Sequence, residues 1–430
     1  MGGRADAPTI ARSRQLPPGE APLRILVISQ YFWPEPFRIN GFVEELRAAG
    51  AEVSVLTGQP NYPEGRVYEG YRWYRWGAER HLVGYPVYRL PLIPRGRSGA
   101  IGLSLNYLSF ILFGWLLGPW LLRGRQFDVM FVYGISPILQ GFVGLPLRRL
   151  KRAKLVLWVQ DIWPDVLVGT GFVKNRRLLG LVGRVVAFLY RRSDLLLTQS
   201  EAFIAPVKAR AGPTPVEYFP NSGDPPEGGI ASPPTALTGR FDIVFAGNLG
   251  RAQALGTIAE AAALIADQPD IHITLFGSGA MEAWLAQEIE TRRLANISIG
   301  GRLPPEAMPD VYRRASAVLL TLVADEMVNL TVPSKLQSYL GAGVPIIAAV
   351  TGEPARIVAE SGGGIVCPPE DASRLAEAMR AMHARPPAER VAMREAGRTY
   401  FAAHFQPHLL AQELIARFKQ LIVPAEGVAR

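Results

Sequence analysis

The sequence has little cysteine and little histidine, and both shortages limit its chemistry. One cysteine in 430 residues, Cys367, excludes a disulfide framework and any cysteine-built zinc or iron–sulfur site, and it suits a reducing compartment. We therefore expect a cytoplasmic protein. The five histidines are scattered without metal-ligand spacing, so no metal site is expected. Residues 1–22 are rich in Pro, Gly and Arg and lack the apolar core of a signal peptide, which predicts a disordered lead-in outside the fold.

Acidic residues are scarce in the first half of the chain. Up to residue 221 there are 28 Lys or Arg against 15 Asp or Glu, and the remainder has 18 against 22, which gives the net charge of +9. A basic half joined to a mildly acidic half suggests that the first half faces an anionic partner. Nucleic acid is not expected, because no basic–aromatic module, zinc finger or helix-turn-helix spacing is present. Anionic lipid stays a candidate.

Apolar runs of strand length alternate with amphipathic stretches of helix length, the pattern of parallel sheets covered by helices. A Pro-, Gly- and Ser-rich segment at 221–239 separates two such series and is the predicted linker. We therefore predict an α/β fold of two Rossmann-like domains, with ligand between them at the carboxyl ends of the strands. The predicted strands are 23–29, 53–57, 129–133, 155–159, 195–198 and 217–219 in domain 23–220, and 243–246, 271–276, 297–299, 317–322, 344–350 and 364–366 in domain 240–405.

The chain after residue 371 contains no further strand pattern and is predicted to be helical to about residue 422. Its last part, residues 406–430, is free to pack back across the domain junction onto the first domain.

Residues 98–122 contain no charge and are flanked by arginines on both sides. By length alone the segment could span a bilayer. The predicted strands before and after it belong to one sheet, however, and a single crossing would separate them. We favour a helix or helical hairpin lying in the cytoplasmic leaflet with Trp115 and Trp120 at headgroup depth, so the protein is expected to be peripheral or monotopic at the inner face of the cell membrane. A buried helix of the first domain is the alternative.

Two glycine-containing turns follow predicted strands of the second domain. Residues 241–256 place Gly247 and Gly250 directly after a strand and before a helix, with Arg251 in the same turn. Small residues there let backbone amides approach an anion, and the helix start adds partial positive charge. A tight strand-to-helix turn needs the same glycines without any ligand. Residues 276–280 repeat the arrangement.

The segment 329–343 is more informative. Pro333 is placed for the first turn of a helix, Thr331 can cap that helix, and Lys335 lies one turn in. Free amides plus an ammonium make a site for a diphosphate, although a capped helix with a solvated lysine would look the same. Asp325 and Glu326, just before this segment, are predicted to lie at the end of a strand and to face the cleft. There they would either bind sugar hydroxyls or be solvated charges of the loop.

In the first domain, residues 158–166 end a buried strand with Gln160 and Asp161. A carboxylate at the carboxyl end of a strand is a site candidate, and Asp161 is favoured over Asp165, which suits a helix cap. Residues 30–41 and 60–65 are loops at the same edge. Their aromatic and Asn side chains suit sugar binding, or serve only to pack the loops.

Taken together these segments resemble the family 4 glycosyltransferases of the GT-B fold, in particular the bacterial branch that assembles O-antigen, capsule and colanic-acid-type polysaccharide. The resemblance covers roughly residues 23–418. Its marks, in order, are QYFWPEP, PNYPEG, LNYLSF, VQDIWPD, PNSGD, AGNLG, TVPSKLQSYLGAG, GEPARIV and GGGIVCPPED.

The resemblance implies a retaining, metal-independent transferase with no cofactor, whose substrate is a nucleoside-diphosphate sugar. It implies a UDP donor carrying an N-acetylated aminosugar, held by the second domain, and an acceptor held by the first. The catalytic candidates are Asp161, from its place at the end of a strand, and Lys335 and Arg251, the cations nearest to a diphosphate. The implied donor-binding residues are Gly247, Asn248, Gly250, Gln253, Gly277, Gly279, Arg302, Asp325, Glu326, Asn329, Thr331, Ser334, Ser338 and Glu353; the implied acceptor-binding residues are Tyr31, Pro34, Arg38, Asn40, Asn61, Tyr62, Gln160 and Trp163.

The sequence departs from the family pattern at several positions. Many members have two glutamates on the diphosphate helix where this chain has Leu330 and Ser338. Asn248 and Gln253 replace an Arg and a Lys, which leaves Arg251 and Lys335 as the nearest cations to a diphosphate. Gln160 stands where His is common, so no general base is assigned.

A polyprenyl-diphosphate-linked saccharide is the preferred acceptor, because it matches the arginines and apolar surface of the first half. A soluble acceptor stays open. The competing functions are a sugar-nucleotide 2-epimerase of the same fold, disfavoured by the missing histidine and by residues 98–122, and a non-catalytic membrane adaptor, favoured by the two missing glutamates.

Overall fold

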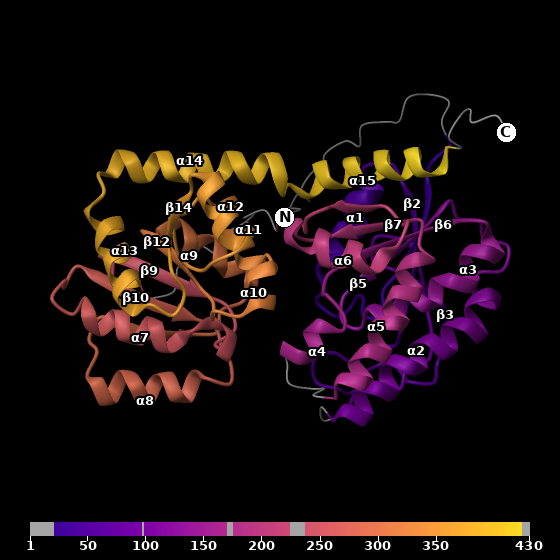
Figure 1. Ribbon diagram of the computed structural model, residues 1–430, viewed down its shortest axis with the longest axis horizontal. Helices are drawn as coiled ribbons and strands as arrows, with labels where there is room; N and C mark the ends of the chain where they lie inside the picture. The colour runs from indigo at the N-terminus through magenta and orange to yellow at the C-terminus, as the bar shows by residue number, and fades with distance from the viewer. Residues whose placement is uncertain (1–20, 97–98, 170–174, 224–236, 424–430) are drawn as a thin grey trace, which may run out of the picture.

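The computed structural model describes residues 21–96, 99–169, 175–223 and 237–423, and it consists of two α/β domains side by side (Figure 1). The first domain is an eight-stranded sheet in the order β3-β4-β2-β1-β5-β6-β7-β8, parallel except for the β3–β4 hairpin. Its strands are β1 (Arg24–Ile28), β2 (Glu52–Thr57), β3 (Gly77–Arg80), β4 (Pro86–Arg89), β5 (Val129–Gly134), β6 (Lys154–Val159), β7 (Leu195–Thr198) and β8 (Val216–Tyr218).

Helices cover both faces of this sheet. The helix α1 shows why the amphipathic pattern folds as it does: its buried residues Ile39, Phe42, Val43 and Leu46 recur at helical spacing and form one face against the sheet. The first-domain helices are α1 (Arg38–Ala48), α2 (Ala100–Leu121), η1 (Ile138–Val143), α3 (Gly144–Lys151), α4 (Asp165–Gly169), α5 (Arg176–Arg191), η2 (Glu201–Phe203) and α6 (Ile204–Ala211).

The second domain is a six-stranded parallel sheet in the order β11-β10-β9-β12-β13-β14. Its strands are β9 (Phe241–Ala246), β10 (Ile271–Phe276), β11 (Ile297–Gly301), β12 (Ala317–Thr321), β13 (Ile346–Ala349) and β14 (Gly364–Cys367). Its helices are η3 (Arg251–Gln253), α7 (Leu255–Leu264), α8 (Glu282–Arg292), η4 (Pro305–Ala307), α9 (Met308–Arg314), α10 (Glu326–Leu330), α11 (Ser334–Ala342) and α12 (Glu353–Ser361). The predicted fold class, two Rossmann-like domains, is confirmed.

Three helices end the described chain: α13 (Ala372–Ala384), α14 (Pro387–His404) and α15 (Pro407–Ile422). Prolines begin α14 and α15, where a missing N–H costs nothing, so the predicted helical region is divided in three. The last two lie end to end along one side of both domains (Figure 1). Leu410, Leu414 and Phe418 of α15 are buried in the core of the first domain, which confirms the predicted return of the last helix.

The carboxyl ends of the two sheets face each other across the domain junction. Arg38, at the start of α1 after β1, donates through Nη1 to Oε1 of Gln337 on α11 at 2.8 Å. The backbone N–H of Glu201, after β7, donates to Oε1 of Glu353, after β13, at 3.2 Å. The loops that follow parallel strands in both domains therefore converge at the junction, where ligands of such folds bind.

The uncharged segment forms α2, the one helix in the described residues that is long and apolar enough to cross a membrane. The strand β1 pairs directly with both β2 and β5, and α2 lies between β2 and β5 in the chain. A single crossing would divide this sheet. Phe110 of α2 is fully buried while Leu116 is 64% exposed, so α2 packs on the first domain with one side and leaves the other side uncovered.

Most of the predicted lead-in (residues 1–20) and of the linker (residues 224–236) lies outside the described residues.

Candidate active site

The two glycine turns of the second domain pack against each other backbone to backbone. Gly247 follows β9 and Gly277 follows β10, both with φ near +144°. A Cβ on Gly277 would lie 1.8 Å from the carbonyl oxygen of Gly247, and one on Gly279 would lie 2.4 Å from that of Leu249. Glycine is therefore required there by the packing of the two turns, whatever ligand they hold.

Lys335 is the cation that these turns surround. It lies in the first turn of α11, with Nζ 4.0 Å from the centroid of the Phe245 ring and hydrogen-bonded to Oε1 of Gln253. A Cβ on Gly247 would lie 3.3 Å from the same Nζ. The side chain of Lys335 is half-buried, and this burial lowers the pKa of its ammonium from the ordinary 10.5 to about 7. Among the described residues no carboxylate pairs with Lys335, so its charge is available to an anionic ligand.

The start of α11 adds backbone donors beside Lys335. Its N-cap is Pro333, and no side chain caps the helix. The predicted cap, Thr331, is wrong: its hydroxyl donates back to the carbonyl oxygen of Met327 at 3.1 Å and belongs to α10. The proline holds the residue before it in extended backbone, so the helix begins too late for Thr331 to reach its amides. The uncapped amides are thus left for a ligand.

Of the two predicted acidic residues after β12, Asp325 has a structural role. Asp325 is the N-cap of α10, and its Oδ1 accepts from the N–H groups of Met327 at 2.9 Å and Val328 at 3.1 Å. The oxygen that caps the helix is therefore already engaged by backbone N–H groups. Glu326 is exposed in the first turn of α10.

Glu353 is buried at the junction and is already paired. Arg356 donates to its carboxylate at 2.7 Å through Nη2 and at 3.2 Å through Nε, and Glu201 adds its backbone N–H. Nη2 of Arg356 also lies 3.6 Å from Oε1 of Glu201. These three side chains therefore link the first domain, through Glu201, to the second.

The other donor-side residues lie around these loops. Arg251 in η3 and Arg302 after β11 are exposed, with no ion pair in the described parts of the chain. Asn248 is exposed and Gln253 half-buried in the turn after β9. The remaining residues lie at or near the start of α11 or in α10: Asn329, Ser334 and Ser338, the last donating to the Ser334 carbonyl oxygen at 3.4 Å.

Asp161 follows β6 at the carboxyl edge of the first sheet. Its Oδ2 accepts from Ser136 twice, from the hydroxyl at 2.7 Å and from the backbone N–H at 3.1 Å. Trp163 donates through Nε1 to the same hydroxyl at 3.1 Å. Burial raises the pKa of the Asp161 carboxyl above its ordinary value. One oxygen is thus held in place, and no cation pairs with the carboxylate among the described residues.

Several predicted acceptor residues are engaged in packing their own loops. The hydroxyl of Tyr31 donates to Oδ1 of Asn106 at 2.9 Å, and the Tyr62 ring lies 5.0 Å from that of Phe37. Asn61 is fully buried. The others form the same framework: Asn40 bridges the backbone of Trp33 and Glu35, and Pro34 lies between those two residues.

Sequence reasoning missed the carboxylate that organises these loops. Glu35 is buried, with Oε1 accepting from the N–H groups of Asn61 and Tyr62, both at 2.7 Å, and Oε2 from that of Phe32 at 3.1 Å. Burial raises its pKa to about 7, although these three amides oppose the shift. An acid inside the prolines and aromatics of QYFWPEP was the available signal.

A hydrogen-bonded chain joins the two halves of the site. Gln337 of α11 donates through Nε2 to the backbone oxygen of Asn221 at 2.7 Å, and Asn221 donates through Nδ2 to Oε1 of Gln160, also at 2.7 Å. Gln160 directly precedes Asp161, and Gln337 lies two residues after Lys335. Arg38 adds a bond from Nη1 to the oxygen of Ser222 at 2.8 Å. The structure therefore brings residues predicted in both domains to one junction.

No group of three His, Cys, Asp or Glu side chains suited to a metal ion occurs among the residues that the structure describes. Two facing parallel α/β domains, with the last helix crossing from the second to the first, define the GT-B class of glycosyltransferase fold.

Comparison with known families places the chain within that class. Residues 37–222 match the family of the glycosyl transferase 4-like domain, and residues 240–385 match the family of glycosyl transferases group 1. The chain therefore belongs to the group 1, GT4-type glycosyltransferases. A relative in Escherichia coli K12 named as a colanic acid biosynthesis glycosyl transferase, WcaI, is 26% identical over 348 residues, which are 75% of this chain and 82% of the relative.

Solved structures show the same fold at low sequence identity. The sucrose-phosphate synthase of Thermosynechococcus elongatus has a TM-score of 0.71 at 18% identity, covering 93% of this chain and 99% of that one. The Anabaena protein HepE, in complex with UDP, has a TM-score of 0.66 at 14% identity, covering 93% of this chain and all of that one.

Proposed function

We propose that this glycosyltransferase moves a sugar, an N-acetylated aminosugar, from UDP to a lipid-linked or saccharide acceptor in cell-surface polysaccharide synthesis, with retention of configuration and without a metal. Membership of the family supports transfer from a nucleotide sugar. The UDP held by HepE and the name of WcaI support the nucleotide and the product class. The observation that carries the proposal is Lys335, a desolvated ammonium without a carboxylate partner at the uncapped start of α11.

The charge that develops during transfer explains that geometry. When the bond between the anomeric carbon and the diphosphate breaks, negative charge builds on the leaving oxygens and positive charge on the ring. Lys335 and the amides that begin α11 meet the negative charge. A preorganised donor of this kind contributes about 2.7–4 kcal/mol to the transition state. Arg251, exposed in η3 beside the same turn, is the second cation available to the diphosphate.

The first domain supplies the opposite charge. Asp161 is held through Oδ2 by Ser136, which leaves its other oxygen to face the ring or the acceptor. No nucleophilic side chain of the enzyme is required. In a front-side attack the acceptor oxygen bonds to the anomeric carbon, the carbon–phosphate oxygen bond breaks, and the leaving phosphate oxygen takes the proton of the acceptor hydroxyl.

The test is to mix purified protein with UDP-, GDP- and dTDP-sugars, with and without a polyprenyl-diphosphate saccharide. We expect release of UDP only when the acceptor is present, and an unchanged anomeric configuration in the product by NMR. Conversion of the sugar without acceptor would instead identify an epimerase. No reaction with any combination of donor and acceptor would support the alternative of a non-catalytic membrane adaptor.

A further inference from the structure

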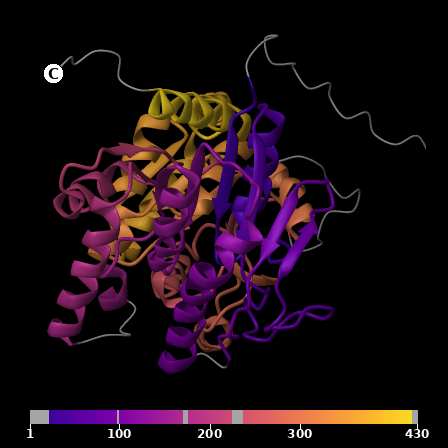
Figure 2. The same cartoon turned by 90° about the vertical axis from the view of Figure 1, so that its right-hand side faces the viewer.

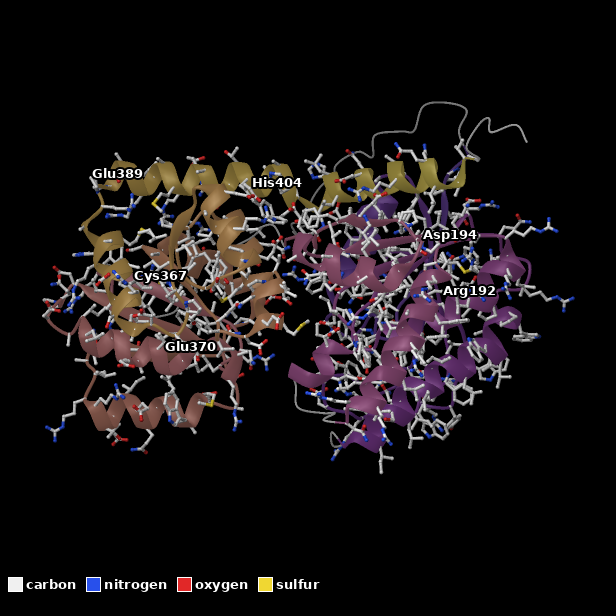
Figure 3. All side chains as sticks on the ribbon, viewed as in Figure 1. Arg192, Asp194, Cys367, Glu370, Glu389 and His404 are labelled. Carbon is white, nitrogen blue, oxygen red and sulfur yellow. The ribbon has the colours of Figure 1, made fainter. Side chains whose placement is uncertain are left out.

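A groove of about 610 Å³ lies between α2, α3 and α5, on the part of the first domain far from the domain junction. Trp115, Leu145 and Phe188 supply apolar walls, and Arg149, Arg191 and Arg192 lie around them. Figure 3 labels Arg192 and Asp194 on this side of the molecule, away from the second domain.

The groove is too far from the catalytic junction to hold the transferred sugar. Its residues Arg192 and Ser193 come before the amino end of β7, and α3 comes before β6. Asp161 follows the carboxyl end of β6, which is six residues long. At about 3.3 Å per residue the two sites lie about 20 Å apart, at opposite edges of one sheet.

The charge of the groove is not neutralised by the protein. Asp194 is occupied by Arg148, at 3.0 Å. Arg149, Arg191 and Arg192 have no ion pair among the described residues, and Arg192 lies over the ring of Phe188 with its guanidinium carbon 4.9 Å from the centroid. The helices α2, α3 and α5 together contain seven Arg or Lys and no Asp or Glu.

The groove continues into an exposed apolar surface. On α2, Ile101, Leu108 and Leu116 are 77%, 58% and 64% exposed. On α5, Leu181 and Phe188 are about half exposed. Phe142 of η1 joins the two helices: its ring stacks on Phe188 and its carbonyl oxygen accepts from Nε1 of Trp115 at 2.8 Å. Both views show α2 and α5 at the end of the first domain opposite α15 (Figure 2).

We propose that α2 and α5 form one membrane-contact face and that the groove between α2, α3 and α5 binds the phosphate headgroup of an anionic phospholipid. Leucine and tryptophan side chains enter the interface while the arginines meet the phosphates, the arrangement of monotopic proteins. This membrane-contact face follows α2. The helix begins at the edge of the sheet that faces the domain junction, and it ends at the opposite edge, beside the groove. A lipid-borne acceptor in the same leaflet would then approach the junction along α2, a consequence that rests on the proposed function.

The test is flotation of the full chain with vesicles of phosphatidylcholine alone and of equimolar phosphatidylcholine and phosphatidylglycerol, without donor or acceptor. We expect tighter binding to the anionic vesicles. The double variant Arg149→Gln and Arg191→Gln should bind them about 30-fold more weakly, since each basic residue at such a surface contributes about fivefold to the affinity.

The matched control is Arg293→Gln with Arg314→Gln, which removes the same charge from exposed positions of the second domain. It should keep wild-type binding. Equal binding of wild type to both vesicles, an unaffected groove variant, or an equal loss in the control would overturn the proposal. The flotation assay contains no sugar substrate, so it tests membrane binding alone. A failure of membrane binding and a failure of the proposed sugar transfer can therefore be told apart.

A second variant separates insertion from simple charge attraction. Leu108→Gln, Leu112→Gln and Leu116→Gln replace exposed leucines of α2 and leave the arginines in place. Wild type should stay partly bound to anionic vesicles in high salt, whereas this variant should be released. Complete release of wild type by mild salt would contradict insertion of the face.

Discussion

At the residue scale, the site depends on a lysine that is desolvated but not paired. Phe245 and Gln253 hold the ammonium of Lys335 by a ring face and a neutral amide. A carboxylate in their place would neutralise the charge before any substrate arrived. The free-energy cost of keeping this ammonium half-buried and unpaired appears in its lowered pKa. In the proposed function, a diphosphate bound beside Lys335 would recover that cost.

Lys335→Ala should lower kcat about a hundredfold, because one donor to the leaving diphosphate is lost. The fold should be retained, since the change removes a desolvated charge from the native state. The measurement is steady-state UDP release together with the melting temperature. Lys208→Ala, at an exposed lysine of α6, is the control and should match wild type. Unchanged turnover in Lys335→Ala would remove this lysine from the site.

The pKa of Lys335 predicts a proton linked to UDP binding. Above pH 7 the free enzyme loses the proton that the diphosphate requires, so affinity should fall as the pH rises from 7 to 9, and binding at pH 8 should take up close to one proton. Titration calorimetry at pH 8, in buffers of different ionisation enthalpy, measures the uptake. Lys335→Met should show none, and uptake that persists in this variant would refute the assignment.

The same shift affects stability with a definite sign. Between pH 7 and 10.5 the unfolded chain holds a proton on Lys335 that the native protein has lost. Folding stability should therefore rise with pH across this window through this group, and the rise should be absent in Lys335→Met.

Asp161→Asn should reduce transfer more than donor binding, since the proposed mechanism assigns its carboxylate to the ring or the acceptor and not to the nucleotide. The measurement is kcat beside the Kd for UDP. Asp165→Asn, which weakens an ion pair with Arg210, is the control and should leave both nearly unchanged. Equal losses of kcat and UDP affinity in Asp161→Asn would reassign the residue to the donor side.

At the scale of elements, the donor site depends on two turns that approach each other at backbone distance. Gly277→Ala places a Cβ 1.8 Å from the Gly247 oxygen at a φ of +143°. We expect a loss of at least about 2 kcal/mol in the free energy of unfolding, measured by urea denaturation, together with weaker UDP binding. Gly256→Ala in α7, where the nearest atom is 3.7 Å away, should be neutral or stabilising. Tolerance of both changes alike would contradict the packing.

Strands, helices and their order could be predicted from the sequence, because a buried parallel strand is an apolar run and α1 carries its apolar residues at helical spacing. The β3–β4 hairpin was not predicted: β3 is a four-residue edge strand with alternating exposure and two charges. Helix N-caps were harder to predict than strands and helices. The pattern assigns Thr331 to α11 and gives Asp325 no capping role, since the sequence does not show where a short helix such as α10 begins and ends.

At the scale of the whole molecule, the junction joins residues that lie far apart in the chain. Arg38 meets Gln337, and Glu201 meets Glu353. Neither pair follows from a local pattern, so the resemblance alone assigns Arg38 to the acceptor and Glu353 to the donor. The crossing of the last helix could be anticipated, because the chain beyond residue 371 contains no further strand and its apolar face needs a partner.

That crossing helix should hold the first domain together. Phe418 is fully buried against Phe131, with ring centroids 5.5 Å apart. Phe418→Ala should cost about 3–5 kcal/mol of unfolding free energy, measured by urea denaturation. Leu409→Ala, at an exposed position of α15, should cost little. A small effect at Phe418 would mean that α15 is not part of the core.

The most direct test of the central claim is a crystal structure with UDP bound. We predict that the diphosphate lies at the start of α11, with its oxygens about 2.7–3.2 Å from Nζ of Lys335 and from the first amides of the helix. A diphosphate bound away from Lys335, or a structure in which Lys335 keeps its bond to Gln253 and contacts no phosphate, would contradict the account.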